Sequence, residues 1–252
     1  MVSVSANTGA GKLQDRYRAV ASPVARRLWR FTLEGFDRLP TDGPAILCPN
    51  HVSFLDSAFL MLMVPRRISF VGKAEYMDNW KTKFLFPAMG MIPIDRAGGD
   101  RSQAALDAAE GVLRRGELFG IFPEGTRSRD GLLYKGHTGA ARLAFRVGCP
   151  IYPVGVVGTR EIQPPDAKMP KLRQHCSIRI GRPIKPERFK RHDEHYGLRQ
   201  MTDEVMFEIR ELSGQEYRDV YATKKAPDIT AEVLKVPSLP AELRLQDAVP
   251  VG

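Results

Sequence analysis

The chain has 252 residues, of which 43% are hydrophobic, so it is long enough to bury one sizeable core. Its composition excludes a collagenous, low-complexity or disulfide-stapled protein. The formal net charge of +9 favours an anionic partner, such as a phosphate-bearing ligand, an anionic lipid surface or nucleic acid, without choosing among them. The three cysteines, Cys48, Cys149 and Cys176, are widely spaced, which is typical of reduced structural thiols in a cytoplasmic protein.

No stretch of the sequence reaches the roughly 18 uncharged apolar residues that a membrane span needs. Residues 1–12 lack the apolar core of a signal peptide and are expected to be disordered. We therefore expect a cytoplasmic protein that contacts a membrane only at its surface, on the inner face of the cell membrane.

Residues 13–31 are predicted to form basic amphipathic helices. Apolar side chains recur at intervals of three and four residues, which places them on one helical face: Leu13, Tyr17, Val20, Val24, Leu28 and Phe31. Arginines occupy much of the remainder, and Ser22-Pro23 could divide the segment into two short helices. Such a helix fits the headgroup region of an anionic membrane, and it fits equally well packed on its own domain with arginines in solvent.

Residues 32–222 alternate between short apolar runs and helical patterns. Strands are predicted at 31–36, 45–48, 68–72, 90–94, 118–122, 150–157 and 176–180. Helices are predicted at 57–64, 84–89, from about 101 to 115, at 139–147 and at 198–212. This alternation predicts one α/β domain with a largely parallel central sheet flanked by helices. Residues 223–252 contain four prolines and no clear periodicity, which predicts a loose tail.

A candidate base follows the apolar run at 45–48. His51 comes at the end of this strand, and Asp56 opens the next helix, which is expected to turn back towards it. Ligands bind at the carboxyl ends of strands in open α/β sheets. A carboxylate beside an imidazole fixes its tautomer and stabilises the imidazolium that forms when the ring takes a proton. The pair is thus a candidate general base, although a helix N-cap Asp beside a structural His would explain the same spacing.

Other polar residues follow neighbouring strands of the predicted sheet. They are Lys73, Asp95 and Arg96, and Glu124 and Arg127. Because the carboxyl ends of parallel strands meet at one edge, these groups are expected to form a pocket with a general base and several cations. Such a pocket suits a phosphorylated alcohol, since Arg forms forked contacts with phosphate and Lys supplies a point charge.

Four blocks of the sequence resemble, in order and spacing, those of the glycerolipid acyltransferases. They are Asn50-His51-x4-Asp56, Gly90-x-Ile92-x-Ile94-Asp95-Arg96, Phe122-Pro123-Glu124-Gly125-Thr126-Arg127-Ser128 and Pro150-Ile151-x-Pro153-Val154. The similarity is greatest to the bacterial 1-acylglycerol-3-phosphate (lysophosphatidate) acyltransferases and covers residues 35–160. Together, the His-x4-Asp and Phe-Pro-Glu-Gly-Thr-Arg-Ser blocks favour catalysis over the N-cap explanation.

This resemblance implies transfer of a fatty acyl group from acyl-CoA or acyl-carrier protein to the free hydroxyl of lysophosphatidate, giving phosphatidate. His51, held by Asp56, would deprotonate that hydroxyl as it attacks the thioester, with no acyl-enzyme. The implied partners are acyl-CoA, lysophosphatidate and an anionic membrane surface, and no nucleic acid. Neither a cofactor nor a metal is expected.

Roles for further residues follow from the same resemblance. Arg127, Lys73 and Arg96 would bind the acceptor phosphate, while Glu124 and Gly125 would shape the acceptor site. A salt bridge is the alternative for Arg96, and a buried orienting role is equally open for Glu124. Four apolar residues could line an acyl channel, but core packing is favoured for them: Phe54, Phe59, Met61 and Met63.

Two alternatives stay open. The same chemistry could act on glycerol-3-phosphate, on another lysophospholipid or on a sugar hydroxyl of a glycolipid. Alternatively, the chain could be a non-catalytic basic protein that binds membrane or nucleic acid, in which case His51 would be dispensable.

Overall fold

The computed structural model describes residues 8–73, 90–94, 101–165, 167–190 and 193–222. The described residues all belong to one compact unit. The predicted helix at 84–89, Asp95, Arg96 and the predicted tail lie outside the described residues.

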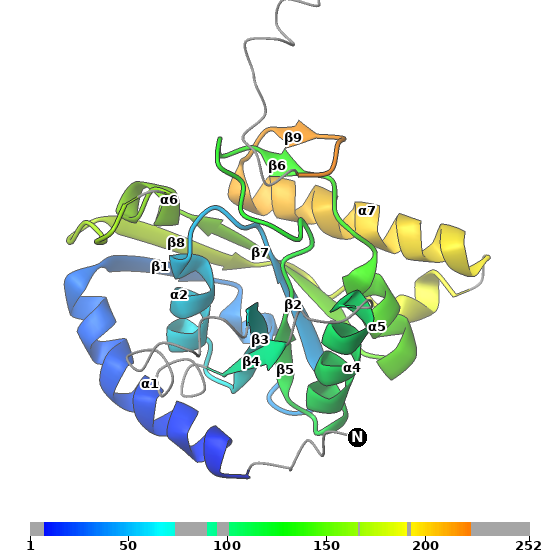
Figure 1. Ribbon diagram of the computed structural model, residues 1–252, viewed down its shortest axis with the longest axis horizontal. Helices are drawn as coiled ribbons and strands as arrows, with labels where there is room; N and C mark the ends of the chain where they lie inside the picture. The colour runs from blue at the N-terminus through cyan, green and yellow to red at the C-terminus, as the bar shows by residue number, and fades with distance from the viewer. Residues whose placement is uncertain (1–7, 74–89, 95–100, 166, 191–192, 223–252) are drawn as a thin grey trace, which may run out of the picture. The chain divides into compact units, whose positions relative to one another are not determined.

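In the described part of the chain, seven strands form one sheet in the order β1-β8-β7-β2-β5-β3-β4 (Figure 1). They are β1 (Arg30–Glu34), β2 (Ala45–Pro49), β3 (Ile68–Lys73), β4 (Met91–Ile94), β5 (Leu118–Gly120), β7 (Ile151–Val157) and β8 (His175–Ile180). Neighbouring strands pair in parallel except β7 and β8, which are antiparallel. The predicted α/β fold with a largely parallel sheet is confirmed.

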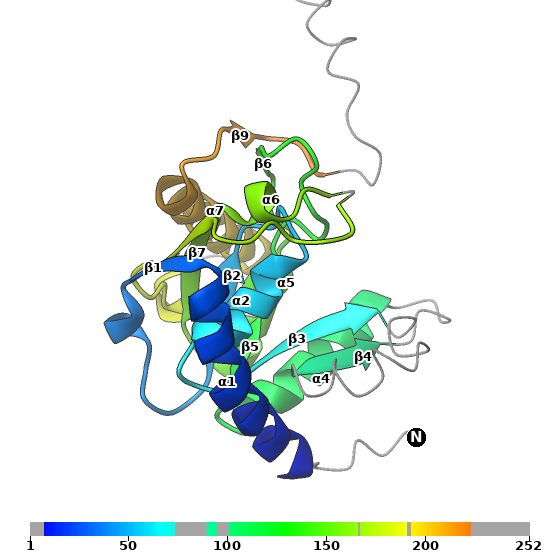
Figure 2. The same ribbon diagram turned by 90° about the vertical axis from the view of Figure 1, so that its left-hand side faces the viewer.

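Helices cover both faces of this sheet (Figures 1 and 2). They are α1 (Thr8–Leu28) and α2 (Leu55–Met63) on one face, and α4 (Arg101–Arg114), α5 (Gly139–Val147) and α7 (Glu194–Ser213) on the other. Side chains of β2 alternate between the two cores, since Ile46 packs with α4, α5 and α7 while Leu47 packs with α2. A strand buried on both faces reads as an unbroken apolar run, which is why β2 was predictable.

Local chemistry sets the ends of α7. Its N-cap, Asp193, accepts hydrogen bonds through its side chain from the amides of His195 and Tyr196 at 3.0 and 3.3 Å. Gly214, with φ of 72°, ends the helix in the left-handed conformation. The cap adds a first turn before Leu198, where the apolar periodicity begins, so the helix is longer than predicted.

Helix α1 differs from its prediction. It begins at Thr8, within the range expected to be disordered, and runs through Pro23 as one helix. The predicted apolar face is buried only in part: Tyr17 and Phe31 pack against the core, whereas Val20 and Val24 are 72% and 52% exposed. The core-facing side also uses small and polar groups: Ala25 is buried, and the Gln14 side-chain amide donates to the carbonyl of Ile68 at 2.7 Å.

Several short elements had no signal in the sequence. They are the helix α6 (Thr159–Ile162), the 3₁₀ turns η1 (Phe36–Arg38) and η3 (Pro186–Arg188), and the strands β6 (Leu133–Tyr134) and β9 (Tyr217–Arg218). The two short strands pair with each other in parallel. Across the described residues, no helix combines the length and apolar character that a bilayer-spanning segment requires.

Candidate active site

Two sequence-distant blocks meet at one edge of the sheet. His51 follows β2, and the Phe122–Ser128 segment follows β5, the neighbour of β2. The amide of Ser128 donates to the carbonyl of His51 at 2.7 Å, so the two turns are joined directly. As predicted, the carboxyl ends of parallel strands bring these blocks together.

The His51 and Asp56 side chains form a pair, with Nδ1 of His51 2.9 Å from Oδ2 of Asp56. Asp56 lies in the first turn of α2 and is fully buried, while the side chain of His51 is 16% exposed. Oδ2 of Asp56 also accepts from the amides of Val52 at 2.8 Å and Ser53 at 2.9 Å. Because Nδ1 donates to the carboxylate, Nε2 is the ring nitrogen left to accept a proton.

Thr159 holds the second oxygen of Asp56, a role that we did not predict from the sequence. Its hydroxyl donates to Oδ1 of Asp56 at 2.5 Å, and Thr159 is fully buried. Thr159 is the first residue of α6 and follows Gly158, whose φ is 95°. Only glycine fits at position 158, because a Cβ there would lie 2.2 Å from the carbonyl oxygen of His175. Both carboxylate oxygens of Asp56 therefore have fixed donors.

Phe122 forms one wall of the imidazole site. Its ring stacks on that of His51, with centroids 3.7 Å apart and an interplanar angle of 17°. On a further side Phe122 stacks with Phe70, at 5.6 Å and 25°. Stacking limits the orientations open to the imidazole. We did not predict this role of Phe122 from the Phe-Pro-Glu-Gly-Thr-Arg-Ser block.

Glu124 lies beneath the turn and is only 1% exposed. Its Oε1 accepts from the amide of His51 at 3.0 Å, and its Oε2 accepts from the amide of Tyr134 at 3.1 Å. Burial raises the pKa of Glu124 to about 8, although the two amides act in the opposite direction. In this structure Glu124 therefore holds the backbone of the His51 turn.

Gly125 and Arg127 occupy the exposed part of the same segment. The amide of Gly125 donates to the carbonyl of Phe122 at 3.1 Å, and the φ of Gly125 is 74°, a conformation that suits glycine. Arg127 is exposed, and within the described residues its guanidinium takes part in no hydrogen bond or ion pair. It adjoins Ser128, whose amide bonds to the carbonyl of His51, so Arg127 belongs to a turn that is joined directly to the turn of the candidate base.

The remaining predicted site residues are placed only in part. Lys73 ends β3 and pairs in register with Ile94, at the edge where β2 and β5 also end. Arg96 lies outside the described residues. Of the residues considered for an acyl channel, Phe59, Met61 and Met63 of α2 are buried in the core, and Phe54 is 37% exposed.

Asn50, directly before His51, joins the end of β2 to β7 and to Gln215. Its side-chain amide donates to the carbonyl of Val156 at 2.9 Å and to the side chain of Gln215 at 2.7 Å, and its oxygen accepts from the amide of Val156 at 2.7 Å. Gln215 in turn donates to the carbonyl of Gly131 at 2.7 Å. Residues after α7 thus support the turn that carries His51.

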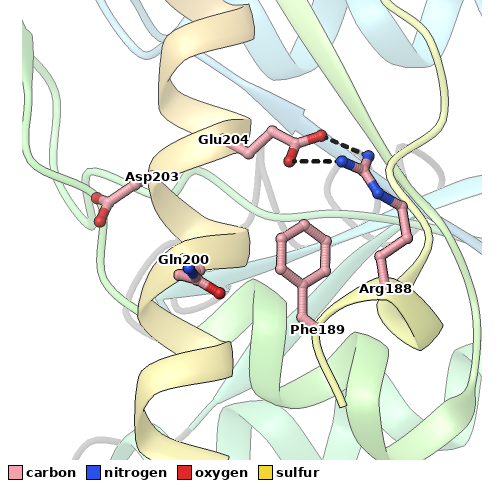
Figure 3. Close-up of a pocket in the computed structure, with 5 residues that line it drawn as sticks. All are labelled: Arg188, Phe189, Gln200, Asp203 and Glu204. Atoms are coloured by element: carbon pink, nitrogen blue, oxygen red, sulfur yellow. Dashed lines mark hydrogen bonds and ion pairs between the residues drawn. The ribbon is translucent and has the colours of Figure 1, made fainter. Parts of the chain in front are cut away.

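A surface pocket elsewhere in the chain does not contain these groups. Figure 3 shows it between η3 and α7, lined by Arg188, Phe189, Gln200, Asp203 and Glu204. Arg188 donates to Glu204 across it at 2.9 and 3.4 Å. In the described ranges, no three His, Cys, Asp or Glu side chains gather in a way that could hold a metal ion. The candidate site is therefore defined by the residues that converge at the sheet edge.

Known proteins share both the sequence pattern and the fold. Residues 30–157, about half of the chain, match the family described as Acyltransferase. Over 178 residues the chain is 28% identical to chloroplastic 1-acyl-sn-glycerol-3-phosphate acyltransferases of Brassica napus and Arabidopsis thaliana, covering 67% of this chain and 51% and 49% of theirs. The chain thus spans about half the length of the curated relatives it matches. The crystal structure of the 1-acyl-sn-glycerophosphate acyltransferase PlsC from Thermotoga maritima matches with a TM-score of 0.63 and 23% identity, over 81% of this chain and 79% of that one.

Proposed function

Because this chain belongs to the acyltransferase family, we propose that it transfers a fatty acyl group to the free hydroxyl of lysophosphatidate, giving phosphatidate. The donor would be acyl-CoA or acyl-carrier protein. The names of the plant relatives, 1-acyl-sn-glycerol-3-phosphate acyltransferases, support this acceptor. The observation that carries the proposal is the His51–Asp56 pair, whose turn is joined by the Ser128–His51 backbone hydrogen bond to the segment that contains Arg127.

In the proposed reaction, Nε2 of His51 removes the proton from the acceptor hydroxyl as the oxygen attacks the thioester carbonyl. Asp56 stabilises the imidazolium that forms. The tetrahedral intermediate then collapses, the carbon–sulfur bond breaks, and the thiolate takes the proton from His51. A positioned base of this kind contributes about 10²- to 10⁴-fold to the rate. The steps need both substrates bound together and involve no acyl-enzyme, cofactor or metal.

The acceptor phosphate is proposed to bind Arg127. Its guanidinium is exposed and has no hydrogen bond or ion pair with the described residues, so an incoming phosphate would displace no partner among those residues. Lys73 at the end of β3 and Arg96 are proposed as further phosphate ligands. Gly125 leaves room for the acceptor, while Glu124 shapes the site by holding the amides of His51 and Tyr134.

The test of this proposal is turnover by His51→Ala. Release of free thiol from acyl-CoA would be followed with lysophosphatidate as acceptor, together with binding of the acceptor. We expect turnover to fall at least about 10²-fold while acceptor binding is kept. Equal turnover by the variant and the wild type would contradict the general base.

The protein is further proposed to act at the inner face of the cell membrane as a peripheral protein. The outer side of α1 carries exposed apolar residues, Leu13, Val20 and Val24, beside the exposed arginines Arg16 and Arg27. Apolar groups next to cations suit the interface of an anionic bilayer. Val20→Ser with Val24→Ser should weaken binding to anionic vesicles without unfolding the protein, because neither side chain is in the core.

A further inference from the structure

The segment at 163–174, which we call the 163–174 loop, combines exposed apolar and basic side chains. It follows α6 and precedes β8. Met169 is 78% exposed and Leu172 is 54% exposed, while Lys168, Lys171 and Arg173 are also exposed. An exposed group of large apolar side chains flanked by cations indicates a surface that binds a partner.

Topology places this loop at the same sheet edge as His51. Strand β7 runs parallel to β2, so both end at that edge. Strand β8 is antiparallel to β7, with Val157 opposite Ser177, and therefore begins there. The loop that joins them extends from this edge, near α6 in Figure 1. A direct link exists as well, since the hydroxyl of Ser53 donates to the carbonyl of Gln163 at 3.0 Å.

Backbone contacts fix the loop while leaving its side chains outside. The amide of Lys171 donates to Ile162 at 2.8 Å, and its carbonyl accepts from the indole of Trp29 at 2.8 Å. Next to it, the amide of Arg173 donates to the carbonyl of Leu28 at 2.8 Å. Among the described residues Arg173 alone has a positive φ, 59°, without being a glycine. Such a conformation is strained and persists where surrounding contacts hold it.

The same contacts join the loop to the end of α1. Leu28 and Trp29 are its partners, and they directly precede β1, which also begins at this edge. The exposed apolar and basic side of α1 is therefore continuous along the chain with the anchoring points of the loop. The loop and the C-terminal end of α1 therefore meet at the edge that carries His51.

We propose that the 163–174 loop is a second membrane contact, which inserts Met169 and Leu172 between anionic lipid headgroups and holds the His51 edge against the bilayer. This inference rests on the proposed function, since a membrane-borne acceptor gives the contact its use. Three of the four ionisable residues in the loop sequence are basic, which complements an anionic surface. Flexible aliphatic side chains suit acyl chains, whereas single-stranded nucleic acid is bound by aromatic stacking.

The experiment compares vesicle binding of two loop variants with that of two controls. The loop variants are Met169→Ser with Leu172→Ser, and Lys168→Glu with Lys171→Glu. They alter side chains only, so the backbone hydrogen bonds that fix the loop remain available. The controls are Phe207→Ser and Arg210→Glu, which change exposed residues of α7. This helix lies on the other face of the sheet from α1. Binding is measured by co-sedimentation with phosphatidylcholine vesicles, with and without phosphatidylserine.

We expect each loop variant to bind phosphatidylserine-containing vesicles at least about ten-fold more weakly than the wild type, and the controls to bind as the wild type does. The charge-reversed variant should lose the preference for phosphatidylserine. Loop variants that bind both vesicle types like the controls would overturn the inference. So would loss of binding to a fluorescent oligonucleotide while vesicle binding is kept.

Turnover on a short-chain lysophosphatidate that stays monomeric in water separates this inference from the proposed function. The loop variants should turn over this acceptor at the wild-type rate and lose turnover only when the acceptor is presented in vesicles. If the wild type turned over neither form, the proposed function would fail, and the vesicle-binding result would still decide on the membrane contact.

Discussion

The two halves of the candidate site are built in opposite ways. Around Asp56, both carboxylate oxygens accept hydrogen bonds from fixed donors, and the imidazole of His51 is stacked on Phe122. Arg127 is exposed and takes part in no hydrogen bond or ion pair with the described residues. Proton transfer depends on fixed geometry. The proposed phosphate ligand would itself form the hydrogen bonds to the Arg127 guanidinium, so that side chain needs no fixed partner beforehand. The contrast teaches that order is concentrated where the chemistry would occur.

Asp56→Asn should give the largest effect, because it removes charge from the ordered half. The asparagine oxygen can still accept from His51, Val52 and Ser53, and its NH₂ group can donate to the hydroxyl of Thr159, which can rotate to accept. The fold should therefore survive while the imidazolium loses its stabilising charge. We expect kcat to fall about 10²- to 10⁴-fold, measured by thiol release. A variant that melts like the wild type and keeps its kcat would contradict the proposed role of the carboxylate.

Arg127→Gln tests the exposed half. Loss of charge-assisted hydrogen bonds to phosphate, worth about 1.5 to 3 kcal/mol, should raise the KM for lysophosphatidate about 10- to 100-fold with little change in kcat. Initial rates at varied acceptor concentration measure both constants. The matched control is Arg142→Gln, an exposed arginine of α5. An unchanged KM, or the same rise in the control, would remove Arg127 from the acceptor site.

Thr159→Val should have a smaller effect on the ordered half. Valine keeps the shape of threonine but leaves Oδ1 of Asp56 without its donor, so the carboxylate is less firmly oriented. As a positioning residue, Thr159 should affect kcat, by about ten-fold, and leave the KM for the acceptor unchanged. Thr159→Ser, which retains a hydroxyl, should restore kcat. If the serine variant were as slow as the valine variant, packing and not the hydrogen bond would explain the loss.

Glu124→Gln should change the pH dependence of folding more than the rate. The pKa of Glu124 is about 8 in the fold against 4.5 for an ordinary glutamate, so between these values the folded state binds more protons than the unfolded chain. The free energy of unfolding should therefore decrease as pH rises from 5 to 8, by about 2 to 4 kcal/mol from this group. Urea unfolding at both pH values should show a smaller decrease in the glutamine variant. The control Glu161→Gln, at an exposed position, should behave like the wild type.

The parts of the molecule that follow local rules were predictable from sequence. Strand β2 is an unbroken apolar run because both of its faces are buried, and His51 and Asp56 are close because a short turn separates strand from helix. Thr159 could not be predicted, since it reaches Asp56 from a distant four-residue helix without periodicity.

Helix α1 shows where periodicity misleads. Of its predicted apolar stripe, Tyr17 packs against the core while Leu13, Val20 and Val24 are exposed. Gln14 is buried, and its side-chain amide donates to the carbonyl of Ile68 in β3. Periodicity identifies the apolar face of a helix but not the surface against which the helix packs. Here part of the contact is a hydrogen bond from Gln14 to a backbone carbonyl. For the same reason, hydrogen bonds made by buried polar groups such as Glu124 and Asn50 became visible only in three dimensions.

The short pairing of β6 with β9 determines how far the chain can be shortened. A version ending at Ser213 would retain every block of the family resemblance and all of α7. It would nevertheless lose Gln215, which bridges Asn50 and Gly131, and the strand that pairs with Leu133 and Tyr134. Deletion mapping guided by motifs alone would therefore place the minimal domain too early, and expression fragments should extend at least to Ala222.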